Sequence, residues 1–221
     1  MVLITLQLME RLGLEHELHI IDDGSQGPQN EAVLREIVKR FPAVRVITHT
    51  QNRGYGGALR TGFSVASKEW IFYTDGDAQY DVLELERLLE RVGPGVDVVQ
   101  GYKITRHDPL HRIIIGRIYH HFVKMLFALK VRDTDCDFRL IRRSVFDQIS
   151  LKSNSGMICV EMMYRFHQAG LRFVEVPVHH FQRAHGKSQF FNFPRLFRTL
   201  VRLGQFWFVE RVLRRPSKHP D

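Results

Sequence analysis

The chain has 221 residues, of which 44% are hydrophobic and 25% are charged, and it contains no low-complexity stretch or linker. This composition is that of an ordinary globular protein, and the length suits one sizeable α/β domain. No apolar run approaches the ~18 residues that a spanning helix needs, and the N-terminus lacks the basic segment and cleavage site of a signal peptide. Two cysteines without metal-ligand spacing favour free thiols in a reducing compartment.

The net charge of +8 is concentrated at the C-terminal end. Residues 183–221 contain nine Lys or Arg against Glu210 and Asp221, so the first 182 residues are close to neutral. A basic segment of this kind points to an anionic surface, either a membrane or a nucleic acid.

Hydrophobic periodicity predicts helices and strands that alternate along the first hundred residues. The predicted helices are 3–12, 31–41, 54–66 and 82–92, and the predicted strands are 17–21, 44–48, 70–74 and 96–101. Such alternation favours a single, mostly parallel sheet of the Rossmann-like kind with helices on both faces.

The pattern is less regular after residue 101. It predicts helices over 110–129 and 156–169, a polar loop over 133–139, and a strand over 173–178. Pro177 suits an edge or an end of that last strand, because proline cannot donate to a ladder. A final helix is predicted over 194–215.

Two carboxylates one residue apart follow the apolar strand over 70–74. The segment reads Asp75-Gly76-Asp77-Ala78-Gln79. It stands at the carboxyl end of a strand, where open α/β sheets bind their ligands. The oxygens of Asp75, Asp77 and Gln79 are a hard ligand set suited to Mg²⁺ or Mn²⁺, with a substrate diphosphate completing the shell. The alternative is a polar turn that only leaves a strand.

Two further segments could contribute to the same edge of the sheet. Asp22-Asp23-Gly24-Ser25 closes the strand over 17–21, where a carboxylate could bind a nucleoside or could form an Asx-turn or helix cap. The glycine-rich stretch 52–58 begins a helix, and that geometry favours phosphate, although one such turn is a weak signal.

Taken together, these segments resemble the inverting glycosyltransferases of family 2, which have the GT-A fold, and most of all the polyprenyl- and dolichyl-phosphate sugar synthases. The resemblance runs from about residue 3 to 190. It rests on six blocks in order: Asp22 to Ser25, Asn52-Arg53-Gly54, Asp75 to Gln79, Asp133 to Arg139, Glu175 to Val178, and Arg183 to Ser188. Six ordered blocks are far more specific than any one of them.

The resemblance implies a nucleotide-diphosphate sugar as donor. It places Asp23 on the nucleoside, Asp75 on the donor, and Asp77 with Gln79 on the Mg²⁺ or Mn²⁺ at the diphosphate, and it puts Asp137 near the reacting carbon of the sugar. Donor-binding residues would further include Asn52, Arg53 and Gly54, with Arg183 and Lys187 closing over the phosphates. Arg106 and Arg112 would meet an acceptor phosphate, for which a solvated basic face is the alternative.

The expected activity is inverting transfer of the sugar to a polyprenyl phosphate. A phosphate monoester has a second pKa near ~6 and is a good nucleophile at neutral pH, so Asp137 would then only orient groups and arginines would matter more. A saccharide or other hydroxyl acceptor would instead need Asp137 as a base. The alternatives are therefore a hydroxyl acceptor and, from another class, a non-catalytic nucleotide-sugar-binding or scaffold protein.

One departure from the family pattern motivates the scaffold alternative. Family members begin with a strand and a Pro-x-Tyr-Asn-Glu-like turn, whereas this chain starts in what corresponds to the following helix. We therefore expect the first strand and part of the base pocket to be missing, through truncation or in a degenerate or partner-completed domain.

The C-terminal segment is expected to work separately from the catalytic domain. We predict a domain over 1–189 and a basic amphipathic segment over 190–221, whose aromatic residues and arginines suit a helix on an anionic membrane surface. A helix docked on the sheet is the alternative, and nucleic acid is not expected because no reading motif is present. The enzyme would then be cytoplasmic and peripheral on the cytoplasmic membrane face.

Overall fold

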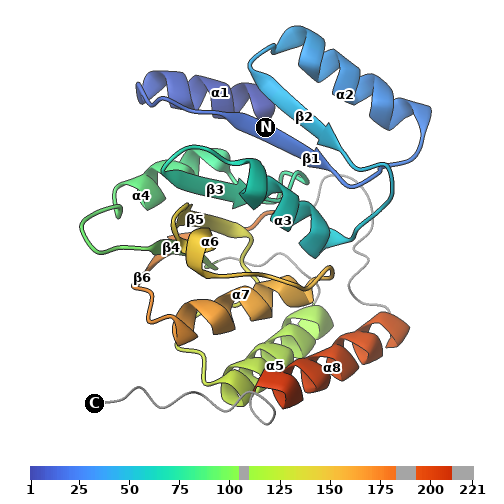
Figure 1. Cartoon of the computed structure of the whole chain (residues 1–221), viewed down its shortest axis with the longest axis vertical. Coiled ribbons are helices and arrows are strands. Elements are labelled where there is room, and N and C mark those ends of the chain that lie inside the picture. The colour runs from blue at the N-terminus through green and yellow to red at the C-terminus, as the bar shows by residue number, and fades with distance from the viewer. Residues whose placement is uncertain (105–109, 183–192, 211–221) are drawn as a thin grey trace. The chain divides into compact units, whose positions relative to one another are not determined.

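The computed structural model describes residues 1–104, 110–182 and 193–210 (Figure 1). The chain forms two compact units. The first comprises Met1–His107 and Arg132–Ala184, and the second comprises Asp108–Val131 and His185–Asp221. All strands of the described residues belong to the first unit.

The first unit contains the predicted strands and helices with small shifts at their ends. The strands are β1 Leu18–Asp22, β2 Val44–Thr48, β3 Trp70–Thr74, β4 Val98–Lys103, β5 Phe138–Arg142 and β6 Phe173–Val178. The helices are α1 Val2–Arg11, α2 Pro28–Arg40, α3 Tyr55–Val65, η1 Val82–Glu84, α4 Leu85–Leu89, α6 Val145–Gln148 and α7 Met157–Gln168. The prediction of an α/β fold is confirmed.

The strands form two hydrogen-bonded sheets, whereas the sequence predicted one. β1 and β2 pair in parallel, and the second sheet has the order β3-β5-β4-β6. Within it β4 and β6 are parallel, while β5 runs antiparallel to both β3 and β4. Three of its four strands therefore share one direction, and β6 lies at an edge, as Pro177 predicted.

The strand β5 is absent from the sequence prediction because Arg139 interrupts its apolar residues. Arg139 is 0% exposed, and its cross-strand neighbours are Tyr73 on β3 and Gln100 on β4. Its guanidinium donates hydrogen bonds to the Tyr73 hydroxyl and, over 2.8 Å, to Gln100 Oε1. A charge that would forbid a buried strand is thus accommodated by polar groups on both adjacent strands.

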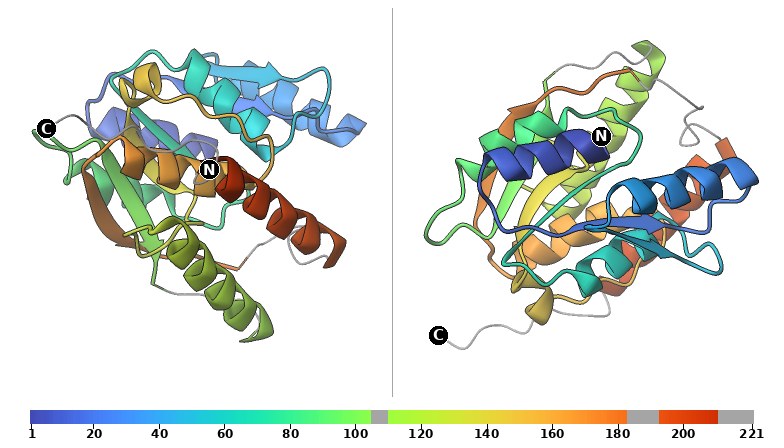
Figure 2. Two further views of the ribbon diagram at one scale, coloured as in Figure 1. Left: turned by 60° about the horizontal axis from the view of Figure 1, so that its bottom comes forward. Right: turned by 90° about the horizontal axis from the view of Figure 1, so that it is seen from above.

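Helices cover both faces of the four-stranded sheet, as predicted. The apolar cluster on one face joins α1 and α4 to the strands, and its buried members include Leu8, Leu85, Leu88, Val99 and Phe138. On the other face, the Phe63 ring of α3 packs edge-on against Tyr73 with 5.4 Å between centroids. Figures 1 and 2 show α1 and α7 on opposite sides of this sheet.

Two strands at the centre of the first unit have a hydrogen-bonded neighbour on one side only. Within residues 1–104, 110–182 and 193–210, β1 pairs only with β2, and β3 pairs only with β5.

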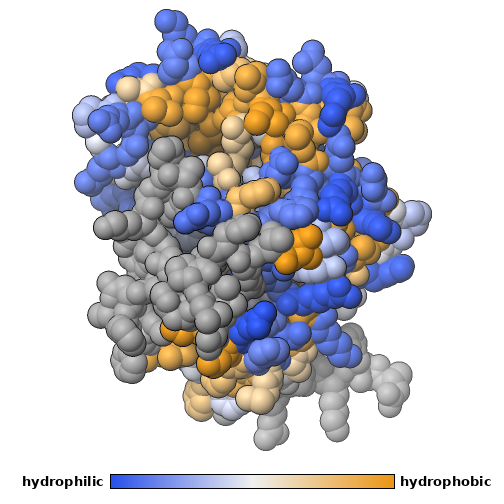
Figure 3. Space-filling model, turned by 180° about the vertical axis from the view of Figure 1, so that it is seen from behind, coloured by the Kyte–Doolittle hydropathy of each residue, from blue (hydrophilic) through white to orange (hydrophobic). Residues whose placement is uncertain are grey.

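Apolar residues gather at the upper end of the rear face, where Figure 1 places α1, β1, β2 and α2 (Figure 3). Exposed apolar side chains of these helices include Leu3, Ile4, Val33 and Val38.

The second unit contains the helices α5, Leu110–Phe127, and α8, Phe193–Phe208. The rings of Phe127 and Phe206 lie 5.5 Å apart, so the two helices contact each other. None of the helices in the described part of the chain combines the length and the apolar character needed to cross a membrane.

Candidate functional site

The antiparallel pairing of β3 and β5 brings two predicted site residues together. Thr74 at the end of β3 lies opposite Phe138 at the start of β5. Continuing this register by one residue places Asp75 opposite Asp137. Two carboxylates that are 62 positions apart in the sequence thus lie at one end of the sheet.

The turn after β3 has the local geometry of a binding turn. The Asp77 Oδ1 atom accepts a hydrogen bond from the Gln79 backbone N–H over 3.1 Å, and Ala78 between them has a φ of +58°. A left-handed alanine is strained, and such strain is often found at ligand sites. The Gln79 side-chain amide donates to the Phe181 carbonyl over 3.0 Å, which fixes its orientation.

Asp23, the predicted nucleoside ligand, is held by residues of the next loop. Its Oδ1 accepts hydrogen bonds from the Arg53 backbone N–H over 2.8 Å and pairs with His49 Nδ1 at 2.7 Å. The Asn52 side chain donates to the Asp23 carbonyl, and the Gly54 N–H donates to Asn52 Oδ1. The structure therefore brings Asp23, Asn52, Arg53 and Gly54 together at the N-terminus of α3, and their binding of a donor stays a prediction.

The glycines of this turn allow close packing, and several of its backbone amides are hydrogen-bonded within the protein. The Gly56 N–H donates to the Asn154 carbonyl over 3.0 Å, and the Arg53 and Gly54 N–H groups have the partners given above. A Cβ atom at Gly54 or Gly56 would collide with carbonyl oxygens of the loop before α7. Their lack of a side chain therefore allows α3 to approach this loop.

The loop before α7 is held by a buried carboxylate that the sequence analysis did not identify. Glu161 is 1% exposed, and its oxygens accept the backbone N–H groups of Lys152 and Ser153 and the Arg165 Nε–H. These bonds hold the pKa of Glu161 below its usual value even though burial opposes this. The carboxylate thus fixes the loop whose Asn154 carbonyl anchors α3.

Asp137 lies in a polar network. The Cys159 thiol of α7 donates to Asp137 Oδ1 over 3.3 Å, and Arg139 Nη1 lies 3.9 Å from the same oxygen. Burial, together with the Asp137 charge, raises the pKa of Cys159, so the thiol stays protonated and remains a donor. The only sequence signal for Arg139 is an arginine between apolar strand residues, and Cys159 has no signal at all.

Tyr55, the first residue of α3, is a further member of the site that the sequence analysis did not select. Its hydroxyl is buried and has no hydrogen-bond partner among the described residues. Burial and then the charge of Asp137 raise the pKa of Tyr55, with smaller contributions from Cys159, Tyr73 and Asp75. The phenol therefore lies within the electrostatic reach of both carboxylates at the end of β3 and β5.

The predicted metal ligands suit a cation that is bound both by the protein and by a substrate diphosphate. No three His, Cys, Asp or Glu side chains gather as a metal site in the described ranges 1–104, 110–182 and 193–210. Asp75 and Asp77 offer two carboxylates at one turn, and Mg²⁺ and Mn²⁺ take their remaining ligands from water and phosphate oxygens. The donor set therefore fits a cation held jointly by the protein and a diphosphate.

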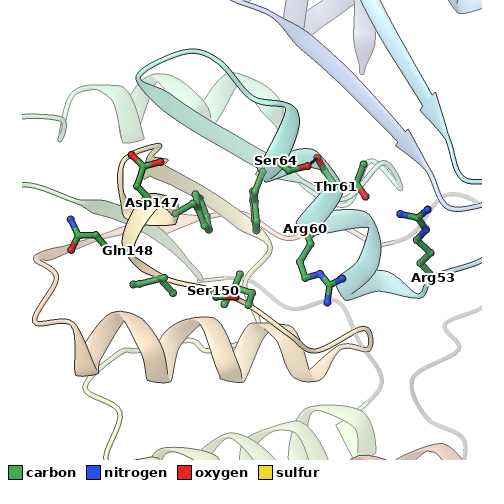
Figure 4. Close-up of a pocket in the computed structure, with 11 residues that line it drawn as sticks. Arg53, Arg60, Thr61, Ser64, Asp147, Gln148 and Ser150 are labelled. Carbon is green, nitrogen blue, oxygen red and sulfur yellow. Dashed lines mark hydrogen bonds between the residues drawn. The ribbon is translucent and has the colours of Figure 1, made fainter. Parts of the chain in front are cut away.

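A pocket of about 530 Å³ lies between α3 and the segment from α6 to the following loop (Figure 4). Its lining residues are Arg53, Arg60, Thr61, Phe63, Ser64, Phe146, Asp147, Gln148, Ile149, Ser150 and Leu151. Arg53 is the one predicted site residue among them. The Arg60 guanidinium donates to the Lys152 carbonyl over 2.9 Å, so it also supports the loop before α7.

Four predicted site residues lie beyond what the structure describes. Arg106, Arg183 and Lys187 fall outside the described residues. Arg112 lies in α5, but its side chain is not among those described. Their roles at the acceptor and donor phosphates stay predictions.

Comparison with known proteins agrees with this arrangement. The sequence model of glycosyl transferase family 2 matches residues 3–150. The undecaprenyl-phosphate 4-deoxy-4-formamido-L-arabinose transferase of Edwardsiella ictaluri is 28% identical over 188 residues, which are 84% of this chain and 56% of that protein. The chain thus spans little more than half the length of this relative.

Solved structures show the same fold. Glucosyl-3-phosphoglycerate synthase from Mycobacterium tuberculosis in complex with phosphoglyceric acid superposes with a TM-score of 0.62 at 17% identity, over 86% of this chain and 68% of that one. The same enzyme with Mn²⁺, UDP-glucose and glycerol 3-phosphate gives 0.62 at 16% identity over the same shares. The fold is that of the GT-A glycosyltransferases, and the chain belongs to glycosyl transferase family 2.

Proposed function

We propose that this chain carries the catalytic site of an inverting glycosyltransferase that moves a sugar from a nucleotide-diphosphate sugar to a polyprenyl phosphate at a membrane surface. The observation that carries the proposal is the antiparallel pairing of Thr74 with Phe138, which puts the neighbouring Asp75 and Asp137 at the same end of the sheet. Family membership supports nucleotide-sugar transfer. The named acceptor of the Edwardsiella ictaluri relative, undecaprenyl phosphate, supports the acceptor.

The donor would extend along the N-terminus of α3. Asp23 would hold the nucleoside, and Asp75, Asp77 and the side-chain amide oxygen of Gln79 would hold the diphosphate end. Mg²⁺ or Mn²⁺ at these oxygens would neutralise the charge that develops on the leaving diphosphate. The Mn²⁺ and UDP-glucose in the M. tuberculosis enzyme make this cation and donor chemistry reasonable for the fold.

Asp137 would orient the reacting groups. The Cys159 thiol and the Arg139 guanidinium hold its carboxylate. We expect this carboxylate to lie near the bond that breaks. A phosphate acceptor is ionised at neutral pH and needs no base, so Asp137 would help to position the sugar. Attack from the face opposite the leaving group inverts the anomeric carbon, and Arg106 and Arg112 would meet the acceptor phosphate.

The helices of the second unit support a peripheral position on an anionic membrane. Neither α5 nor α8 contains an Asp or Glu, and each carries several Arg or Lys residues. Exposed apolar side chains of α5 recur at helical spacing: Ile115, Ile118, Phe122 and Met125. Basic and apolar residues together are typical of helices that lie on anionic lipid. We place this surface at the cytoplasmic face, where nucleotide sugars would be available.

Two measurements test the proposal. Binding of UDP-glucose, UDP-galactose, UDP-N-acetylglucosamine and GDP-mannose with Mn²⁺ is measured by calorimetry. Transfer from each radiolabelled donor to undecaprenyl phosphate in detergent is followed by lipid extraction, with undecaprenol as the matched acceptor that lacks the phosphate. We expect one donor to bind only with the cation and to label only the phosphate acceptor.

Each other outcome contradicts a defined part of the proposal. Binding of none of these donors would contradict the nucleotide-sugar site. Equal labelling of undecaprenol, or labelling of a saccharide alone, would contradict the phosphate acceptor. Binding without turnover on any acceptor would favour the scaffold alternative.

A further inference from the structure

The hydroxyl group of Tyr55 differs from those of Tyr73 and Tyr80 in its lack of a hydrogen-bond partner among the described residues. The Tyr73 hydroxyl accepts a hydrogen bond from Arg139, and the Tyr80 hydroxyl is hydrogen-bonded to Cys136. The Tyr55 side chain is only half-buried, but its hydroxyl is buried and has no partner among the described residues. An unpaired buried hydroxyl destabilises a fold, so its retention calls for an explanation.

The position of Tyr55 is fixed by its neighbours in the sequence. Two residues before it, the Arg53 N–H is bonded to Asp23, and one residue after it, the Gly56 N–H is bonded to Asn154. Gly54 takes a φ of +81° so that α3 can begin here. The start of α3 is therefore anchored on both sides of Tyr55, and the ring has a defined location.

That location lies between the two halves of the proposed donor site. The Arg53 N–H, two residues before Tyr55, binds Asp23, the proposed nucleoside ligand. Burial and the charges of Asp137 and Asp75 raise the pKa of the Tyr55 hydroxyl. We expect a nucleotide-diphosphate sugar that contacts Asp23 and Asp75 to bring its oxygens near this residue. Its oxygens are the acceptors that an unpaired O–H group lacks.

We propose that Tyr55 is a donor-binding residue whose hydroxyl gives a hydrogen bond to an oxygen of the nucleotide sugar, on either its diphosphate or its sugar. The inference rests on the proposed function, because it needs a nucleotide sugar between Asp23 and Asp75. Ligand binding then supplies the partner that the folded chain does not.

The test compares Tyr55→Phe with Thr74→Val. Tyr55→Phe removes a buried hydroxyl that has no partner among the described residues, and Thr74→Val replaces such a hydroxyl by a methyl group. Thr74 follows Tyr73 on β3, so its side chain lies on the opposite face of the sheet from the Tyr73 ring that packs against α3. The affinities of wild type and both variants for UDP-glucose, UDP, GDP-mannose and GDP are measured with Mn²⁺, beside thermal melting without ligand.

We expect Tyr55→Phe to weaken binding of a nucleotide sugar about tenfold, as the loss of a hydrogen bond to a ligand does, without lowering the melting temperature. Thr74→Val should leave the affinities unchanged and should likewise not lower the melting temperature. Weaker binding of the free nucleoside diphosphate as well would place the hydrogen bond on the diphosphate. Weakening confined to the nucleotide sugar would place it on the sugar.

The inference and the proposed function fail in different ways. If wild type binds none of these nucleotides, the proposed function is contradicted together with its donor site. If wild type binds and Tyr55→Phe binds within twofold of it, only the role of Tyr55 is wrong. A lower melting temperature with unchanged affinity would show a structural hydroxyl, and equal losses in both variants would also overturn the inference.

Discussion

Arg139 on β5 lies close to Asp137, which precedes that strand, with its Nη1 atom 3.9 Å from the Asp137 Oδ1 atom. The guanidinium is fully buried and is held by Tyr73, by Gln100 and by the Thr134 carbonyl over 2.7 Å. Arg139 belongs to β5, and its partners Tyr73 and Gln100 belong to β3 and β4. The arginine therefore connects three strands of the sheet with the carboxylate of the proposed active site.

Replacing this arginine should strongly destabilise the fold. Arg139→Ala leaves several buried acceptors without a donor, and we expect the free energy of unfolding to fall by about 3–5 kcal/mol. Urea denaturation measures the change. Arg142→Ala on the same strand is the control, because Arg142 stacks on Trp70 and pairs with the exposed Glu69, contacts that contribute only about 1 kcal/mol. Equal losses in both variants would contradict the role of the network.

Asp77 is the sharpest test of the cation site. Asp77→Asn keeps an oxygen that can accept the Gln79 N–H but removes the negative charge, so the turn should persist while Mn²⁺-dependent donor binding disappears. Calorimetry with and without Mn²⁺ measures this. Asp81→Asn is the matched control, since Asp81 Oδ1 accepts the Leu83 N–H in the same manner and lies outside the proposed ligand set. Retained Mn²⁺ dependence in Asp77→Asn would refute the assignment.

Sequence patterns predicted the fold best where apolar residues alternate without interruption. β2, β3 and β6 have the predicted bounds, because a short run rich in β-branched or aromatic residues between polar turns favours a strand. β5 was missed because the buried Arg139 looks like a surface residue until its partners on the adjacent strands are known. The two separate sheets likewise depend on pairing, which a single sequence does not encode locally.

The candidate site was predictable to the extent that it lies at strand ends. Asp23, Asp75 and Asp77 each follow a strand with a clear apolar pattern. The position of Asp137 opposite Asp75 depends on the antiparallel register of β5, and the burial of Tyr55 depends on the loop held by Glu161. These long-range contacts arise between segments more than 60 positions apart, so local patterns carry no trace of them.

The pH dependence of stability should show the titration of Asp135. Burial, with the charge of Asp133 adding to it, raises the pKa of Asp135 to about 6 from an ordinary value of 3.8. The folded protein thus binds this proton more tightly than the unfolded chain. The contribution of the protonated Asp135 carboxyl to stability is fully present below pH ~4 and is lost as the pH rises to ~6. The free energy of unfolding falls by at most about 3 kcal/mol over this range.

Asp135→Asn removes this titration and should be more stable than wild type at pH 7 and above. The backbone N–H and carbonyl of residue 135, which bond to Asp133 and Lys103, are kept. Urea denaturation from pH 4 to 8 should show the gain shrinking to nothing near pH 4. Asp147→Asn, at an exposed carboxylate that pairs only with Arg143 in the described part of the chain, should change stability by less than about 0.5 kcal/mol at pH 7. A pH-independent gain in Asp135→Asn would contradict the prediction.

The basic helix α8 should bind anionic lipid through charge. Arg198 and Arg202 are exposed and one helical turn apart, and each basic residue near an anionic surface contributes about 1 kcal/mol. Reversing both, as Arg198→Glu with Arg202→Glu, should therefore weaken binding to vesicles containing phosphatidylserine by at least about 30-fold. Co-sedimentation at low and high salt measures the effect, and binding by wild type should fall as salt is raised.

A matched pair on α2 controls for the change in net charge. Arg35→Glu with Lys39→Glu reverses two exposed basic residues at the same spacing. This control should retain most of the vesicle binding, and both double variants should retain Mn²⁺-dependent donor binding because neither helix carries a described donor ligand. An equal loss of vesicle binding in the two double variants would indicate a general charge effect. Salt-insensitive or absent vesicle binding by wild type would contradict the interfacial role of α8.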